Sequence, residues 1–342
     1  MIRARTLISI AVALALVMAL MPTVALAAED SAGGTFTLGN ALPTVDAVAL
    51  WDTEATPAAA TAMTPQVEYN VKVYVEDTDT LDNLSTITVT IYYDTDGDYS
   101  TGSPPVAGNV NTASILTWTN ADPNTWTIDA VSGGGSWSIV DGSCVEPTLT
   151  PNTTGTFEFH FIPGAVATET DATSRWHIYA VAEDKDAATS AGYQENRTMN
   201  WYGAVTIDLA TIAFGSVTLG VVDDQSPNFV LTNIANGDYK LNLKADATWT
   251  GGTTAWELSL DTADENPGDA ELALEADDDA TEADAQLVTD AYLLYTGHAT
   301  DSGPTLEAGA TVDTNTLWLS LGSTGIVADD YSGTIYYQIL ND

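Results

Sequence analysis

Cysteine, basic residues and long apolar runs are all scarce in this chain of 342 residues. Cys144 is the one cysteine, so no internal disulfide can form, and stability must come from packing or from bound metal. Only eight residues are Lys or Arg, against 48 that are Asp or Glu. So acidic a surface repels nucleic acid and anionic lipid headgroups, and it suits divalent cations, basic partners or high-salt solvent. Plain solubility is the alternative explanation of the charge.

The long apolar run lies at the N-terminus, from Leu7 to Leu20. Arg3 and Arg5 precede it, and Ala25-Leu26-Ala27 follows as a small-x-small cleavage site. This pattern predicts a signal peptide over residues 1–28, and the run is too short for a good membrane span. We therefore expect a secreted, cell-surface protein with no integral membrane segment in the mature chain. Without the signal peptide, six basic residues remain against 48 acidic ones, a net charge of −42.

Signatures of catalysis are missing from the sequence. There is no Gly-x-Ser-x-Gly elbow, no Walker loop and no His-Glu-x-x-His, and no pair among His160, His177 and His298 has metal-ligand spacing. Cys144 has acidic neighbours that would raise its thiol pKa, which favours a packed or incidental cysteine over a nucleophile. We expect no enzyme and no catalytic residues.

Alternating strand patterns dominate the mature chain, and nine Trp, 14 Tyr and 45% hydrophobic residues are enough to fill one or two cores. The pattern restarts near Tyr202. The sequence predicts an all-β fold: a signal peptide (1–28), an extended N-terminal arm (29–45) and two consecutive antiparallel, Ig-like β-sandwich domains (46–201 and 202–342). The expected strands are 67–75, 87–93, 156–162, 175–182, 205–209, 212–217, 229–233, 239–245, 316–321 and 333–339. Residues 278–292 are either a helix or a loop with a short turn, because Asp and Thr are poor helix formers.

Three runs carry a resemblance: Phe214 to Gly220, Phe229 to Gly237, and the closing Ala328 to Tyr337. Together they resemble a recurrent C-terminal sandwich of exported bacterial and archaeal envelope proteins, which includes WxL-like, spore-coat-like and surface-filament-like modules. Asn40 to Val45 is similar to the opening of Ig-like modules of large surface proteins. The resemblance implies a structural role for the sandwiches.

The best candidate for a cation site is the loop Asp94-Thr95-Asp96-Gly97-Asp98-Tyr99-Ser100. Carboxylates of Asp94, Asp96 and Asp98, with Ser100 or backbone carbonyls, could surround one Ca²⁺ ion. An Asp-rich turn that ends a strand is the alternative. Asp77, Asp79 and Asp82 form a second, looser cluster. A third, Glu275, Asp277, Asp278, Asp279, Glu282 and Asp284, is more typical of a solvated face.

Other polar and aromatic patterns are weaker. Asn83, Asn152 and Asn196 begin glycosylation sequons, about as many as chance would give. Trp118 and Trp126, with Trp137 nearby, either bind a sugar or fix the register of a hairpin as a cross-strand pair.

Two functional hypotheses follow. In the first, the protein is a structural subunit of an S-layer or extracellular filament that self-associates non-covalently and is stabilised by Ca²⁺. The arm would donate the strand Thr35, Phe36, Thr37 and Leu38 to a sheet edge of a neighbouring subunit. In the alternative, it is a secreted, Ca²⁺-braced adhesion module that binds envelope glycans.

Overall fold

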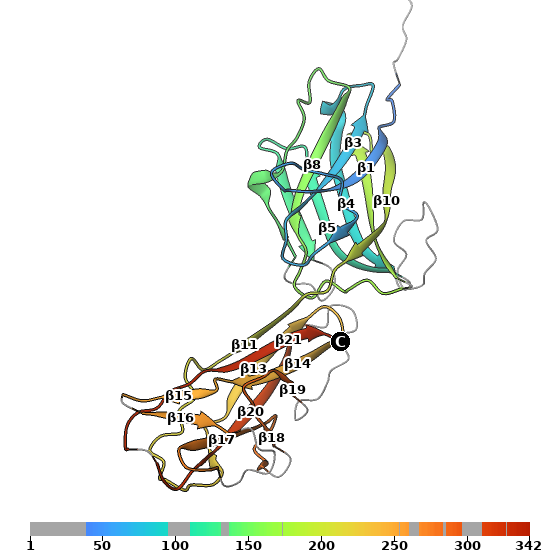
Figure 1. Ribbon diagram of the computed structural model, residues 1–342. Coiled ribbons are helices and arrows are strands. Elements are labelled where there is room, and N and C mark those ends of the chain that lie inside the picture. The colour runs from blue at the N-terminus through green and yellow to red at the C-terminus, as the bar shows by residue number, and fades with distance from the viewer. Residues whose placement is uncertain are drawn as a thin grey trace, which may run out of the picture. The chain divides into compact units, whose positions relative to one another are not determined.

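A computed structural model describes residues 39–94, 110–130, 137–172, 174–252, 254–259, 267–282, 285–295, 310–325 and 327–342, and the fold of this part is all-β (Figure 1). It contains two 3₁₀ turns, η1 (Leu81–Asn83) and η2 (Asp141–Ser143), and no α-helix. Within it, no helix has the length and apolar character to span a membrane.

In the described residues before the predicted boundary at Tyr202 there are ten strands. They are β1 (Thr44–Asp52), β2 (Ala62–Met63), β3 (Tyr69–Glu76), β4 (Leu84–Asp94), β5 (Val110–Thr119), β6 (Thr125–Ala130), β7 (Ser138–Ile139), β8 (Thr154–Ile162), β9 (Arg175–Asp184) and β10 (Thr189–Met199). They form a sheet in the order β1-β3-β8-β7 and another in the order β2-β10-β9-β4-β5-β6.

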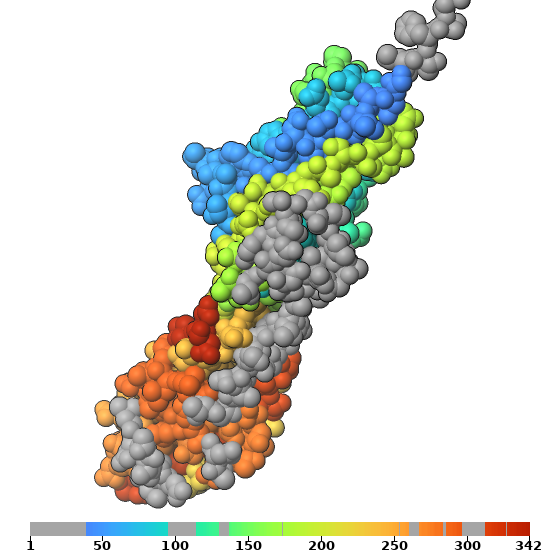
Figure 2. Space-filling model, turned by 90° about the vertical axis from the view of Figure 1, so that its right-hand side faces the viewer, coloured from blue at the N-terminus to red at the C-terminus, as the bar shows by residue number. Residues whose placement is uncertain are grey.

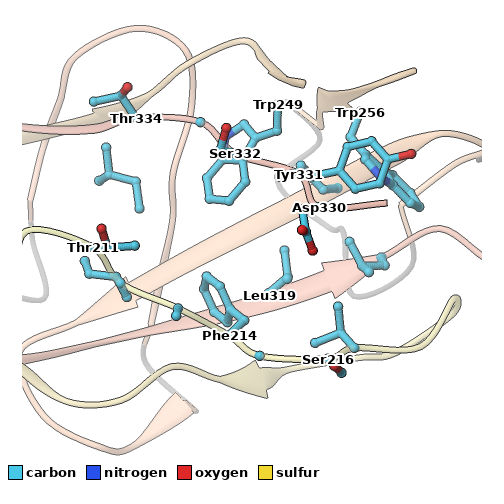
Figure 3. Close-up of a pocket in the computed structure, with 18 of the residues that line it drawn as sticks. Thr211, Phe214, Ser216, Trp249, Trp256, Leu319, Asp330, Tyr331, Ser332 and Thr334 are labelled. Atoms are coloured by element: carbon cyan, nitrogen blue, oxygen red, sulfur yellow. The ribbon is translucent and has the colours of Figure 1, made fainter. Parts of the chain in front are cut away.

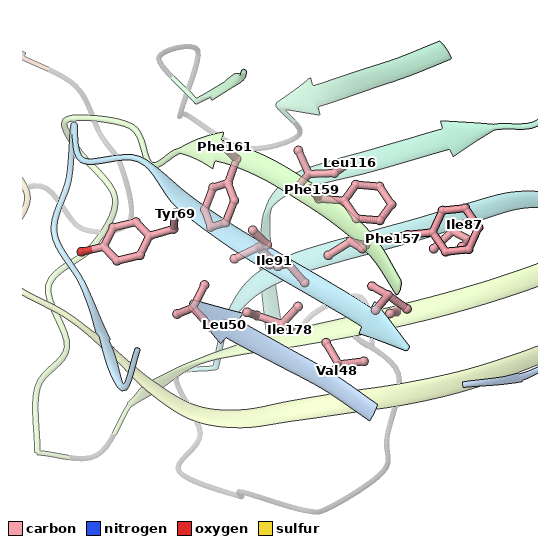
Figure 4. Packing of buried hydrophobic residues seen from close by; sticks show 14 of the residues in the cluster. Val48, Leu50, Tyr69, Ile87, Ile91, Leu116, Phe157, Phe159, Phe161 and Ile178 are labelled. Carbon is pink, nitrogen blue, oxygen red and sulfur yellow. The ribbon is translucent and has the colours of Figure 1, made fainter. Parts of the chain in front are cut away.

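These two sheets face each other across one hydrophobic core. In β3, alternation buries Tyr69, Val71, Val73 and Val75, because successive side chains of a strand point to opposite faces. The opposing sheet contributes side chains such as Ile87, and the layers interdigitate between β3, β4, β8 and β9 (Figure 4). Each fully buried large apolar side chain stabilises the fold by about 1.5–3 kcal/mol.

On one side of this first core, the two sheets meet along β1 and β10. The amide of Val45 in β1 donates to the hydroxyl of Ser190 in β10 at 3.1 Å. In the space-filling view, β1 (blue) and β10 (yellow-green) lie side by side on the surface (Figure 2).

After Tyr202, the part of the chain that the structure describes contains eleven strands. They are β11 (Gly203–Ile207), β12 (Asp224–Gln225), β13 (Phe229–Ala235), β14 (Tyr239–Ala245), β15 (Thr248–Thr250), β16 (Ala255–Leu258), β17 (Glu271–Asp277), β18 (Gln286–Leu287), β19 (Leu293–Leu294), β20 (Ala310–Leu321) and β21 (Ile335–Asn341). The larger sheet runs β11-β13-β20-β17-β16-β15, with β12 and β18 beside it, and the smaller runs β19-β14-β21. Their apolar faces enclose a second buried cluster, from Phe229 to Leu319.

Two expectations about local structure can be compared with this topology. Residues 212–217 form no strand, so that prediction was wrong; Gly215 has a φ of +76°, a left-handed conformation that interrupts an extended run. Of the two readings of residues 278–292, the described part fits the loop, because it holds the short strand β18 and no α-helix.

Candidate functional site

A groove of about 810 Å³ lies at one side of the second buried cluster (Figure 3). One wall is the irregular segment 207–217, which follows β11, and another is the segment 328–334 together with the start of β21. Trp249, Trp256 and Leu319 line it from β15, β16 and β20. The groove is thus built from segments that are far apart in sequence.

The lining of the groove is mainly apolar and aromatic. Ile212, Phe214 and Val217 are half-buried and pack on the second core. Tyr331 stands edge-on to Trp256, and its hydroxyl donates to the carbonyl of Val327 at 2.8 Å and bonds to Thr254. These contacts give the groove a defined aromatic edge.

The charged groups among the lining residues are two exposed carboxylates, Asp329 and Asp330. Asp329 accepts a hydrogen bond from the amide of Gly252 at 2.5 Å. The described residues that line the groove include no His, Cys, Lys or Arg, so none of them offers a histidine base to the serine and threonine hydroxyls. The surface of the groove is divided almost evenly between polar and apolar atoms, so it offers apolar contacts together with hydrogen-bonding groups.

The strand β21, which contributes Ile335 and Tyr337 to this groove, is an edge strand. In the described part of the chain it pairs only with β14, in antiparallel register from Tyr239↔Asn341 to Ala245↔Ile335. Alternate backbone groups of an edge strand point away from its partner and can pair with another chain. β11 lies close to β21, with Gly203 next to Ile339, so the part of the edge that adjoins the groove is the stretch near Ile335 and Tyr337.

The predicted cation loop and the predicted arm lie mostly outside the described residues. Asp94 is the last residue of β4 and is buried, opposite Arg175 in β9. Asp96, Asp98 and Ser100 fall in the part that the structure does not describe, as do Thr35, Phe36, Thr37 and Leu38. Both sites remain predictions.

The three sequon asparagines differ in their surroundings. Asn152 and Asn196 are exposed, and Asn196 has a φ of +58°. Asn83 is half-buried, and its amide donates to the side chain of Asn40 at 3.0 Å.

Cys144 is packed. Burial raises its thiol pKa to about 11, and its sulfur accepts a hydrogen bond from the amide of His160 at 3.3 Å. A thiol with so high a pKa is almost entirely protonated near pH 7 and is a poor nucleophile.

Trp118 and Trp137 belong to the core of the first half, and Trp126 packs against that core. Trp118 lies directly opposite Trp126 on paired strands, as the cross-strand interpretation requires. Trp118 is 0% exposed and packs on Phe157, and Trp137 is also buried. Of the three, Trp118 and Trp137 therefore offer no face to a sugar.

Acidic side chains gather at two places in the second half. Carboxylates of Asp277, Asp278 and Asp279 lie within 4.8 Å of one another, and so do those of Asp223, Glu275 and Glu282. The second set joins two members of the predicted acidic stretch to Asp223, which precedes β12. Proximity of acidic groups alone does not distinguish a site from a solvated face.

Comparisons with known proteins give little for this chain. No family model matches it, and no curated protein does. Among solved structures, a DUF4466 family protein from Parabacteroides merdae aligns over 81% of this chain and 99% of its own, with 10% identity and a TM-score of 0.24. A similarity this low carries no argument about fold or function.

Proposed function

We propose that the protein is an exported structural subunit of the cell surface, built from two consecutive Ig-like β-sandwiches. In this proposal, copies assemble non-covalently into a layer or filament. The observation that carries it is the groove beside β21, which has apolar and aromatic side chains in its lining and adjoins a strand that pairs only with β14 in the described part of the chain.

The occupant that fits the groove is the arm of a second copy. In Thr35-Phe36-Thr37-Leu38, two apolar side chains alternate with two threonines, so a strand of these residues has one apolar face. Residues 31–40 carry no charge, which suits a groove whose charged groups are carboxylates. Strand addition would supply backbone hydrogen bonds along β21, while Phe36 and Leu38 would pack against the aromatic lining.

The test compares mature protein, residues 29–342, with a double variant, Phe36→Ser and Leu38→Ser. Burial of two such side chains is worth about 3–6 kcal/mol, so the variant should associate at least about 100-fold more weakly. Sedimentation velocity and negative-stain electron microscopy would report this. A matched control, Thr35→Ser with Thr37→Ser, should assemble as the wild type does.

A synthetic peptide of residues 29–40 separates the arm from the rest of assembly. It should bind to a protein that lacks residues 29–40 and should block assembly of the wild-type chain. Assembly that is unchanged in the double variant would refute the role of the arm. If the peptide binds the arm-deleted protein but the wild type forms no oligomer, the arm binds within its own chain instead.

A further inference from the structure

Three chain segments converge near the start of β4. Asp77 is the first residue after β3, and Asp184 is the last residue of β9, where the next turn starts. Pairing of β4 with β9 brings these turns together, and the amide of Lys185 donates to the carbonyl of Asn83 at 2.8 Å. The third segment is Asn40-Ala41.

Two carboxylates in these turns are tied to the third segment. The side-chain amide of Asn40 donates to Asp184 at 2.6 Å, and the backbone amide of Ala41 donates to Asp79 at 2.6 Å. Asp184 also accepts from the amides of Asp186 and Ala188, at 2.9 and 2.8 Å. Burial alone would raise the pKa of Asp184, but these hydrogen bonds hold it below its usual value.

Of the carboxylates Asp77, Asp79 and Asp184, Asp77 is the one with a buried oxygen that lacks a hydrogen bond to the described residues. Its side chain is 0% exposed, and one carboxylate oxygen accepts the amide of Asp79 at 2.9 Å, which holds the side chain over that turn. The other oxygen, Oδ2, is buried and has no hydrogen-bond partner among the residues that the structure describes. Burial raises the pKa of Asp77 and the negative charges of Asp79 and Asp184 raise it further, against the lowering effect of the Asp79 amide. An unpaired buried carboxylate oxygen is costly unless something compensates it.

The protein supplies no such compensation here. None of the ion pairs among the described residues includes Asp77, Asp79 or Asp184. Lys185 is the nearby cation in sequence, and it contacts Asp82 instead, with its ammonium 2.6 Å from the Asp82 carbonyl and 3.7 Å from its carboxylate.

We propose that Asp77, Asp79 and Asp184 form a binding site for one Ca²⁺ ion. Three carboxylates in irregular turns, with nearby backbone carbonyls and water, match the six to eight oxygen ligands that Ca²⁺ takes. The carboxylate oxygens are not all within 4.8 Å of one another, unlike the two acidic clusters of the second half. Binding would therefore draw the two turns together, with Asn40 between them.

The proposed ion would hold Asn40, which lies within the predicted arm (29–45). Asn40 contacts Asp184 and follows residues 29–39 in the chain, so an ion here would order the base of the arm. This consequence rests on the proposed strand addition, whereas the ion site itself does not.

The test measures Ca²⁺ binding to mature protein by isothermal titration calorimetry at a fixed 150 mM KCl. Asp77→Asn should weaken binding more than about tenfold, or remove one equivalent of Ca²⁺, because it deletes a charged ligand. Asp82→Asn is the matched control, since Asp82 lies in the same turn, is exposed and pairs with Lys185. Its binding should equal that of the wild type.

Thermal unfolding gives a second readout. With Ca²⁺ about 100-fold above its Kd, the wild-type Tm should rise by about 5 °C or more, and this rise should disappear in Asp77→Asn. Without Ca²⁺ the variant should be at least as stable as the wild type, because it removes an unpaired buried charge. If Asp77→Asn does not fold, Asp79→Asn replaces it.

Three results would overturn the proposal. One is wild-type affinity in both Asp77→Asn and Asp184→Asn. Another is loss of Ca²⁺ binding only in Asp96→Asn with Asp98→Asn, or only in Asp277→Asn. The third is an Asp77→Asn variant that is equally destabilised with and without Ca²⁺. Failure of the arm variants to affect assembly would refute strand addition and leave the ion site standing.

Discussion

His177 is a buried titratable side chain that neither proposal uses, and it ties stability to pH. It lies in β9, 4% exposed, and its ring stacks on Tyr92 with centroids 5.3 Å apart. Burial lowers its pKa, and the charges of Arg175 and Arg197 lower it further. The folded protein therefore holds His177 neutral at a pH where the unfolded chain would protonate it.

This predicts a loss of stability on mild acidification. Since the folded pKa of His177 is below the unfolded value of about 6.5, its contribution is fully present above that pH and is lost as the pH falls below it. Urea denaturation of wild type and His177→Gln between pH 8 and pH 5 measures the effect. The wild type should lose more free energy of unfolding than the variant, and parallel pH profiles would contradict the assignment.

The opposite sign holds for Asp77, whose pKa is raised. Its charged form opposes folding near pH 7, and protonation at low pH relieves that cost. A bound cation would favour the charged form, so Ca²⁺ binding and Asp77→Asn are each expected to remove this cost.

At the scale of elements, the proposed strand addition predicts a particular pattern of amide exchange in β21. Amides that bond to β14 should exchange slowly with deuterium, and the alternate amides that face the open edge should exchange fast. Addition of the arm peptide should slow this second set at least about tenfold. Hydrogen exchange of the arm-deleted protein, resolved by NMR, measures both sets.

The comparison for this measurement is β14, which lies between β19 and β21. Its amides should change little when the peptide binds. Slowing that is uniform over both strands would indicate general stabilisation, and the absence of any change in β21 would place the arm elsewhere.

Alternation predicted those strands whose inward positions are all strongly apolar. In β3, β8 and β9 the pattern gave the strand and its buried face, because burial of one face fixes the period of two. β10 was not predicted, because polar residues such as Ser190, Gln194 and Arg197 interrupt any alternation of apolar side chains and most of its residues are only half-buried. Residues 212–217 had the right composition for a strand, but Gly215 turns the chain and leaves Ile212 and Phe214 to line the groove.

Neither the groove nor the proposed ion site could be predicted in full from the sequence. The groove joins residues near 214, 249 and 331, and the proposed ion site joins Asp184 to Asp77, more than 100 positions away. Such proximity follows from long-range strand pairing, β4 with β9 above all, which local patterns do not specify. Asp77 and Asp79 were visible as an acidic pair, but nothing local showed that Asp77 would be buried without a partner for one oxygen.

At the scale of the whole molecule, the proposed assembly must overcome repulsion between acidic copies. Without the predicted signal peptide the chain carries −42, and at about 0.01 M salt its field extends roughly 30 Å, compared with roughly 10 Å at 0.1 M. Strand addition into an apolar groove gains little from attraction between charges. Repulsion between copies should therefore slow assembly at low salt.

The expected result is faster assembly as salt rises, seen by light scattering between 10 and 500 mM KCl. At constant ionic strength, Ca²⁺ should accelerate assembly more than Mg²⁺, because the oxygen-rich turns around Asp77 suit the larger, more flexible coordination of Ca²⁺. The Asp77→Asn variant keeps the dependence on KCl and loses the additional effect of Ca²⁺, which separates screening from site binding. Assembly that slows as KCl rises would show that charged contacts hold the copies together, and would rule out residues 31–40 of the arm, which carry no charge, as the main source of association.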